Sequence, residues 1–121
     1  MIAHKTWRES KSASDGVRLL AMAHYPRGAK KDICDVWMPE LAPEPDDLKS
    51  YHDDEITWST FIRRYKAKLK EPAQKHLMQL LASLSRSHGT NVTVMCGCEN
   101  AERCHRTTLA AAIEASYRSQ V

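Results

Sequence analysis

Two short apolar runs, separated by a long stretch with helical periodicity, most constrain how this chain can fold. The first run covers residues 17–24 and is broken by Pro26, and the second covers residues 92–95. Apolar runs of this length are typical of strands that are buried on both faces of a parallel sheet. A strand, a helical crossover and a second strand predict an α/β fold: a single three-layer domain with a small, mostly parallel sheet flanked by helices.

The helices are predicted from the spacing of apolar side chains. Residues 55–69 place their large apolar side chains on one face, and so does a second segment that begins at Pro72 and ends before Gly89. A final helix is predicted over residues 101–118, with Asn100 as its N-cap.

The remaining segments are less regular. Residues 2–7 suit a short first strand, whereas residues 29–54 are predicted to be irregular apart from one short helical piece. Pro39 is expected to break that helical piece, because proline does not fit the interior of a helix, and Pro43 and Pro45 are expected to mark a turn or an extended passage. The 121 residues, 42% hydrophobic and 27% charged, fit one globular domain that spans residues 1–121.

Composition and charge indicate where the protein is located and what kind of partner it binds. No apolar run approaches the roughly 20 residues that cross a bilayer, and the N-terminal residues lack the apolar core of a signal peptide. We therefore expect a cytoplasmic protein with no membrane partner. Eighteen basic and fifteen acidic residues give a formal net charge of +3, which weakly favours an anionic partner.

The stretch that is richest in chemically active residues follows the second apolar run. Cys96, Cys98 and Cys104 fall within nine residues, and His105 and Arg106 follow directly. A strand-to-helix junction presents free N–H groups and the positive end of the helix dipole, which favour anions and thiolates. We expect an anion-binding or thiolate-using pocket here, with Cys104 and His105 as catalytic candidates and Cys96 and Arg106 as ligand-binding candidates.

The same residues also suit a structural role or a zinc site. Cysteine is often a small buried hydrophobe, and His105 lies four residues before Leu109 on the predicted core face. Cys96, Cys98, Cys104 and His105 offer four ligands to zinc. Neighbours on a helix point about 100° apart, however, so Cys104 and His105 would converge poorly on one ion. A zinc site that uses only some of the four residues is left as an alternative, and neither a metal nor a cofactor is predicted.

Two known cysteine loops fit this stretch poorly. A loop like that of the phosphotyrosine phosphatases needs Cys-x5-Arg, but the residue at that distance from Cys98 is Cys104. A rhodanese-like loop would cradle an anion, and Glu99 and Glu102 would place carboxylates in it. The rhodanese-like loop is kept only as a remote alternative.

Two further candidates lie outside this junction. Arg27 follows the first apolar run, and ligands of parallel sheets bind beyond the carboxyl ends of the strands, so Arg27 is expected to share a cleft with the junction. The cleft would bind a small phosphate-like or nucleotide-like anion; alternatively, Arg27 ties its own turn to Asp35. His52, followed by Asp53, is a candidate catalytic base or an exposed histidine beside a capping aspartate.

A non-catalytic interaction module is the second class of function. The predicted helix at residues 55–69 has a basic face formed by Arg63, Arg64, Lys66 and Lys68, which would bind nucleic acid, and the domain could also associate with itself. The plain alternative is a solvated helix surface. Whether the domain is an enzyme is left open.

Several motifs resemble those of a known family. They are Tyr25-Pro26-Arg27-Gly28, the run DVWMPELAP at residues 35–43, His52-Asp53 followed by Trp58, Phe61 and Tyr65, and the closing Cys96 with Cys104-His105-Arg106. Together and in this order they resemble the YeaO-like family of uncharacterised proteins, also called domain of unknown function family 488. The resemblance covers nearly the whole chain and implies one α/β domain, without supplying an activity.

Overall fold

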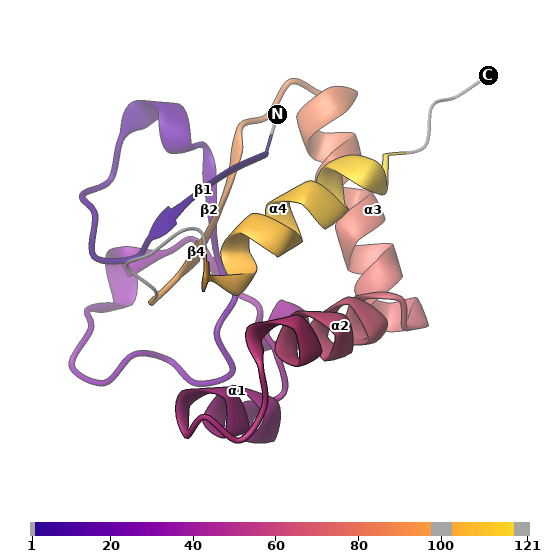
Figure 1. The fold of residues 1–121 in the computed structure, drawn as a ribbon. Helices are drawn as coiled ribbons and strands as arrows, with labels where there is room; N and C mark the ends of the chain where they lie inside the picture. The colour runs from indigo at the N-terminus through magenta and orange to yellow at the C-terminus, as the bar shows by residue number, and fades with distance from the viewer. Residues whose placement is uncertain (1, 98–102, 118–121) are drawn as a thin grey trace.

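The computed structural model describes residues 2–97 and 103–117, and it shows a sheet with helices gathered beside it (Figure 1). In chain order the strands and α-helices are β1 (Ile2–Thr6), β2 (Val17–Leu20), β3 (Val36–Trp37), α1 (Pro45–His52), α2 (Trp58–Leu69), α3 (Pro72–Arg86), β4 (Val92–Cys96) and α4 (His105–Ala115). The strands pair in the order β1-β4-β2-β3, and every pair is parallel. The predicted α/β class and parallel sheet are therefore confirmed.

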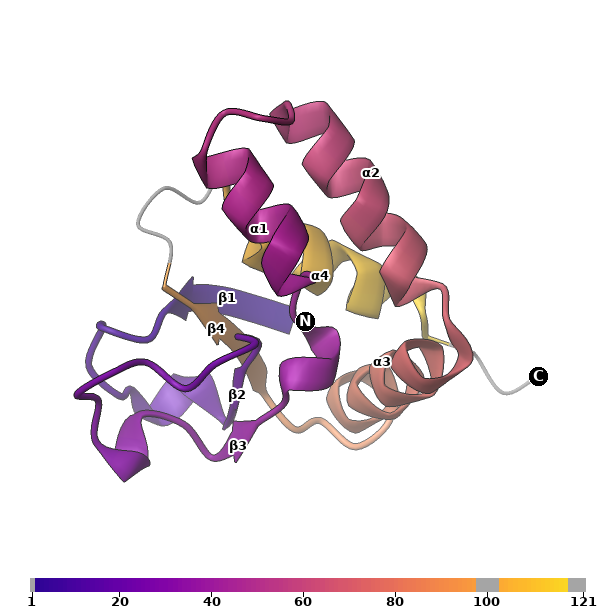
Figure 2. The same cartoon turned by 90° about the horizontal axis from the view of Figure 1, so that it is seen from below.

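The helices gather on one side of the sheet (Figure 2). Helix α4 packs on β1 and β4, α3 packs beside it, and α2 packs on α4 and α3. Side chains alternate along β4, so Val92 and Val94 face α4, where they share one apolar cluster with Leu109 and Ile113. This cluster is the main core of the protein.

The opposite side of the sheet is covered by loops and short 3-10 turns instead of α-helices. The hydroxyl of Thr93 donates to the carbonyl of Asp15, which lies in the 3-10 turn η1 (Ala13–Asp15). The carboxylate of Asp15 in turn accepts from Lys5 Nζ at 2.6 Å. Met95 and Leu20 are also fully buried in the sheet. The layers on the two sides of the sheet are thus unlike each other.

The segment predicted to be irregular contains two regular elements. Strand β3 pairs with β2, and α1 begins at Pro45. The prediction of a turn or extended passage at Pro45 was wrong because proline fits the first helical position, where its missing N–H group has no partner to lose. Pro39 begins a 3-10 turn, η3 (Pro39–Leu41), for the same reason.

Several predicted elements are shorter in the structure. The first apolar run forms a strand only as far as Leu20, and the last helix begins at His105 instead of residue 101. The proposed N-cap Asn100 lies outside the described residues, and Cys104 is the N-cap residue of α4. Among the helices described, none has the length and apolar character to cross a membrane.

Candidate functional site

A pocket of about 420 Å³ opens at the carboxyl edge of the sheet. The segments that follow β2 and β4 form one wall, and α1 with the residues before it forms another. Its lining residues are Met22, Ala23, His24, Pro43, Pro45, Leu48, Lys49, His52, Gly97 and His105. We call it the edge pocket. Its position is the one that ligands of parallel sheets use.

Among the described residues, the ionisable groups that line the edge pocket are all basic. Three are histidines and the fourth is Lys49. Lys49 and His52 lie three residues apart on α1 and therefore share a face of that helix. The Lys49 ammonium also pairs with Asp53, which is not among the lining residues. The pocket therefore combines an apolar wall with cationic or titratable groups.

His105 is the buried histidine among the residues that line the edge pocket. Its side chain is the first of α4, and the residue is 5% exposed. Its Nε2 atom lies 2.8 Å from the carbonyl oxygen of Ala21, and its ring meets the ring of Tyr65 edge-on at 5.6 Å. Burial lowers the pKa of His105, so the neutral ring donates from Nε2 to Ala21. Its Nδ1 atom is buried and has no hydrogen-bond partner among the described residues.

Two buried cysteines lie behind His105. Cys96 ends β4 and Cys104 precedes α4, and both side chains are almost completely enclosed. One ligand atom from each of Cys96, Cys104 and His105 lies within 4.8 Å of the other two. We call these three residues the cysteine–histidine cluster. Cys98 lies outside the described residues.

Arg106 places a guanidinium beside both sulfur atoms. Its Nη1 atom lies 3.5 Å from Cys96 Sγ and 3.8 Å from Cys104 Sγ, and its Nε atom donates to His4 Nδ1 at 3.3 Å. Arg106 is 5% exposed and is not among the residues that line the edge pocket. The predicted meeting of Cys96, Cys104, His105 and Arg106 is therefore found, with Arg106 directed at the sulfur atoms.

The expectation that Cys104 and His105 diverge was wrong. Cys104 has the extended backbone of an N-cap residue, with φ −134° and ψ 139°, and only His105 is helical. The angle of about 100° applies to two neighbours inside a helix and not to this pair. Cys104 and His105 therefore converge, and the cysteine–histidine cluster has the residue types that hold zinc.

A family model described as the active DUF488-N3 subclade matches residues 2–117 of this chain. The chain belongs to the DUF488 family. It is also 30% identical over 99 residues to the uncharacterized protein YeaO of Escherichia coli (strain K12), an alignment that covers 80% of this chain and 83% of YeaO. No solved structure matched the chain. The resemblance to the YeaO-like proteins is thus confirmed.

The motifs that resemble the DUF488 family converge on the edge pocket. Pro43 closes the second motif, His52 opens the third, and His105 belongs to the last, and all three line the pocket. The first motif begins at Tyr25, directly after the lining segment that ends at His24. Residues far apart in the sequence therefore contribute to one cavity.

Arg27 lies apart from this pocket. It is exposed and lines a different depression, together with Arg8, Lys11 and Arg18. His105 is not among the residues that line that depression. The carboxylate of Asp35, suggested as a partner of Arg27, instead accepts from the backbone nitrogen of Arg18 at 2.8 Å and pairs with the Arg18 side chain at 3.2 Å, and these two contacts, the backbone one first, lower its pKa.

The predicted basic face of α2 is partly neutralised. Arg64 pairs with Asp47 at 3.0 Å, and Lys68 pairs with Glu44 at 3.1 Å. Lys68 also donates to the carbonyl of Ala42. These pairs tie α2 to α1 and to the residues before α1, so half of the predicted nucleic-acid face has a structural role.

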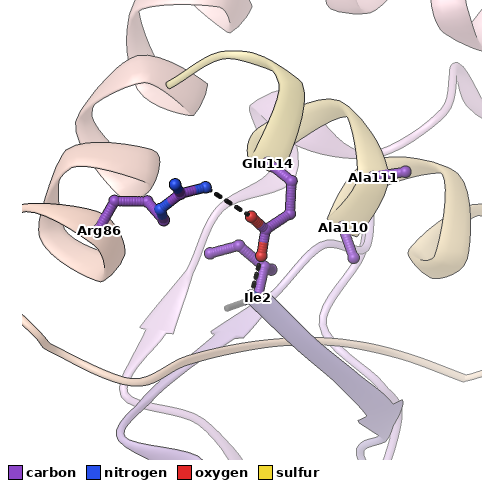
Figure 3. A pocket seen from close by; sticks show the side chains of 5 residues that line it. All are labelled: Ile2, Arg86, Ala110, Ala111 and Glu114. Carbon is purple, nitrogen blue, oxygen red and sulfur yellow. Dashed lines mark hydrogen bonds and ion pairs between the residues drawn. The ribbon is translucent and has the colours of Figure 1, made fainter. Parts of the chain in front are cut away.

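A further depression between β1, α3 and α4 is held by an ion pair. Glu114 accepts from the backbone nitrogen of Ile2 and lies 3.8 Å from Arg86 Nη1 (Figure 3). The two charged side chains that line it therefore point at each other. We interpret these contacts as structural: they hold β1, α3 and α4 together.

The sequence did not indicate His24, Leu48 and Lys49 as site residues. Leu48 and His52 are four residues apart, a spacing that would have placed them on one helix face. The helix that contains these two residues was not predicted, because Pro43 and Pro45 suit a turn or an extended passage. His24 was assigned to a strand, whereas the strand ends at Leu20.

Proposed function

We propose that this DUF488 protein binds a small ligand with an apolar body and an anionic group in the edge pocket, and that His105 and His52 face that ligand. The observation that supports this most is the composition of the lining. Apolar side chains form most of the wall, and the ionisable side chains that the described part of the chain contributes to it are one lysine and three histidines.

Position and size support a small-molecule ligand. The pocket lies beyond the carboxyl ends of β2 and β4, where α/β sheets bind their ligands. Its volume of about 420 Å³ falls within the range of roughly 300–1,000 Å³ that is typical of ligand sites. A mononucleotide or another aromatic phosphate is of suitable chemistry.

Charge supports an anionic group on the ligand. His24 and His52 are exposed, and Lys49 has an exposed ammonium whose partner Asp53 is also open to solvent. A surface ion pair of this kind is worth at most about 1 kcal/mol, so a phosphate or carboxylate can compete for the lysine. Arg106 is buried behind the wall and would act on the cysteines more than on the ligand.

One histidine on the wall supports proton transfer to or from the bound ligand. His52 is exposed at the end of α1, whereas His105 is neutral and buried and its Nε2 atom is engaged by the carbonyl of Ala21. The matching family model is described as an active subclade, which agrees with a catalytic role. Cys104 is 1% exposed, so it would reach a ligand only if the wall moved.

A binding panel tests the proposal. Purified protein is titrated calorimetrically with a nucleoside 5′-monophosphate, the matching nucleoside and inorganic phosphate. We expect the monophosphate to bind at least tenfold more tightly than either fragment, because only it engages both the apolar wall and the basic groups. Equal affinity for all three, or no binding of any aromatic phosphate tried, would count against the proposal.

Three variants assign the binding to the pocket. The double variant Lys49→Ala/His52→Ala and the pocket-filling Leu48→Trp should each weaken binding by tenfold or more. Arg27→Ala removes a positive charge outside the edge pocket and serves as the matched control. A loss of binding in Arg27→Ala alone would move the site to the turn that was predicted from the sequence.

A further inference from the structure

We propose that Cys96, Cys104 and His105 bind a thiophilic divalent metal ion, with zinc as the first candidate. Each residue type is a standard zinc ligand, and the three ligand atoms lie within 4.8 Å of one another. The inference does not depend on ligand binding in the edge pocket.

The distances are close to those of a tetrahedral site. Zinc bonds of about 2.3 Å to sulfur and about 2.0–2.1 Å to nitrogen place neighbouring ligand atoms about 3.5–3.8 Å apart. The ligand atoms, at most 4.8 Å apart, therefore need to approach one another by at most about 1.0–1.3 Å. The extended backbone at Cys104 makes this convergence accessible, because it separates the direction of Cys104 from that of His105.

The hydrogen bonding of His105 is that of a metal ligand. Its Nε2 atom is engaged by the carbonyl of Ala21 at 2.8 Å, which leaves Nδ1 as the nitrogen with a free lone pair. Nδ1 is buried and unpartnered among the described residues, and an unsatisfied buried polar atom costs about 1–3 kcal/mol. A bound metal ion would satisfy it.

Arg106 suits the outer shell of such a site. Its guanidinium reaches both sulfur atoms and would stabilise their thiolate forms, as outer-shell donors do around zinc thiolates. Two thiolates balance the charge of a divalent ion, and a single arginine remains as a hydrogen-bond donor. Three protein ligands leave one coordination position for water or a ligand.

The competing arrangement is a disulfide between Cys96 and Cys104. Among the described residues, neither cysteine is joined in a disulfide in this structure. Oxidation would join their sulfur atoms and release two hydrogens to an oxidant, which would remove both metal ligands. Metal binding and disulfide formation are therefore mutually exclusive. Metal content and native mass, measured on the same purified samples, distinguish the two states.

Metal analysis of the untagged protein provides the test. We expect about one zinc per chain, or, after chelation and addition of Co²⁺, the absorption bands of cobalt bound by thiolate. Cys96→Ser and Cys104→Ser should each lower metal content at least fivefold. Cys34→Ser is the matched control, because Cys34 is a free cysteine outside the cluster, and it should retain the metal.

Several results would contradict the proposed metal site. Absence of both zinc and cobalt bands in folded wild-type protein overturns the proposal, and so does a native mass two hydrogens lower with a Cys96–Cys104 crosslink. Metal that persists in both serine variants assigns it to another site. If a serine variant does not fold, the cobalt bands of the wild type decide. Lys49→Ala/His52→Ala should keep the metal, which separates this test from that of the edge pocket.

Discussion

The Nε2 atom of His105 lies 2.8 Å from the carbonyl oxygen of Ala21, so the first residue of α4 is tied to the chain directly after β2. This contact joins segments that are 84 residues apart. It fixes which ring nitrogen carries the proton and leaves Nδ1 with a free lone pair, in a residue that clusters with Cys96 and Cys104. The edge pocket and the cysteine–histidine cluster share this one side chain.

The first prediction concerns that contact. His105→Ala should lower the free energy of unfolding by about 2–4 kcal/mol, because it removes a buried ring and leaves the Ala21 carbonyl without its donor. Urea denaturation measures the change. His24→Ala, an exposed histidine of the same pocket, should stay within about 0.5 kcal/mol of the wild type. Equal stability of both variants would contradict the tie described above.

The second prediction concerns pH. Lys5 and the backbone of Ser12 donate to the Asp15 carboxylate and hold its pKa below the ordinary value of 3.8. Because the folded-state pKa is lowered, this stabilisation is complete well above pH 3.8 and is lost as the pH falls through the folded value.

Asp15→Asn tests this pH dependence. Urea denaturation at pH 7 should show a free energy of unfolding about 1 kcal/mol lower for this variant than for the wild type. The difference in free energy between the two proteins should disappear below the folded-state pKa of Asp15. A gap that is the same at pH 7 and at acidic pH would show that the charge of Asp15 is not involved.

The third prediction concerns Gly16. Its φ is +64°, and an added Cβ would lie 2.0 Å from the carbonyl oxygen of Asn91. Gly16→Ala should therefore destabilise the protein by more than about 3 kcal/mol or prevent folding. Gly28→Ala is the control, because φ is also positive there but a Cβ meets nothing within 4 Å, and it should cost about 1 kcal/mol. Similar effects of the two changes would argue against the close approach at Asn91.

The fourth prediction concerns the attachment of α2. The buried hydroxyl of Tyr65 donates to the carbonyl of Leu41 at 2.5 Å. Tyr65→Phe should lower the free energy of unfolding by about 1–2 kcal/mol, because it leaves that carbonyl unsatisfied. Tyr25→Phe removes a comparable bond to Lys30 near the surface and should cost less than half as much. Thermal and urea unfolding measure both, and the reverse order would show that the Leu41 contact is weak.

The parallel sheet was predictable because its central strands, β2 and β4, are apolar enough to be recognised from composition alone. Strand β3 was not, since Val36 and Trp37 are 40% and 44% exposed and form only two pairs with β2. Helix α1 was missed because its starting proline also suits a turn. Local sequence does not distinguish these alternatives; the packing of α1 on α2 does.

The site was predictable in part because several of its residues are neighbours in the sequence. Cys96, Cys104, His105 and Arg106 are close in sequence, so a short junction had to bring some of them together. Arg27 was expected to join them because it follows β2, but six residues lie between it and Leu20, and it lines a different depression. Lys49 and Leu48 come from a helix that was not predicted, so no local pattern pointed to them.

The most direct measurement is an NMR map of amide shifts during titration with a nucleoside 5′-monophosphate. We predict that the largest changes fall on residues 22–24, on Leu48 to His52 of α1, and on Gly97 and His105, which together surround the edge pocket. Changes concentrated on residues 27–30, with the pocket residues unmoved, would contradict the assignment of the ligand to the edge pocket.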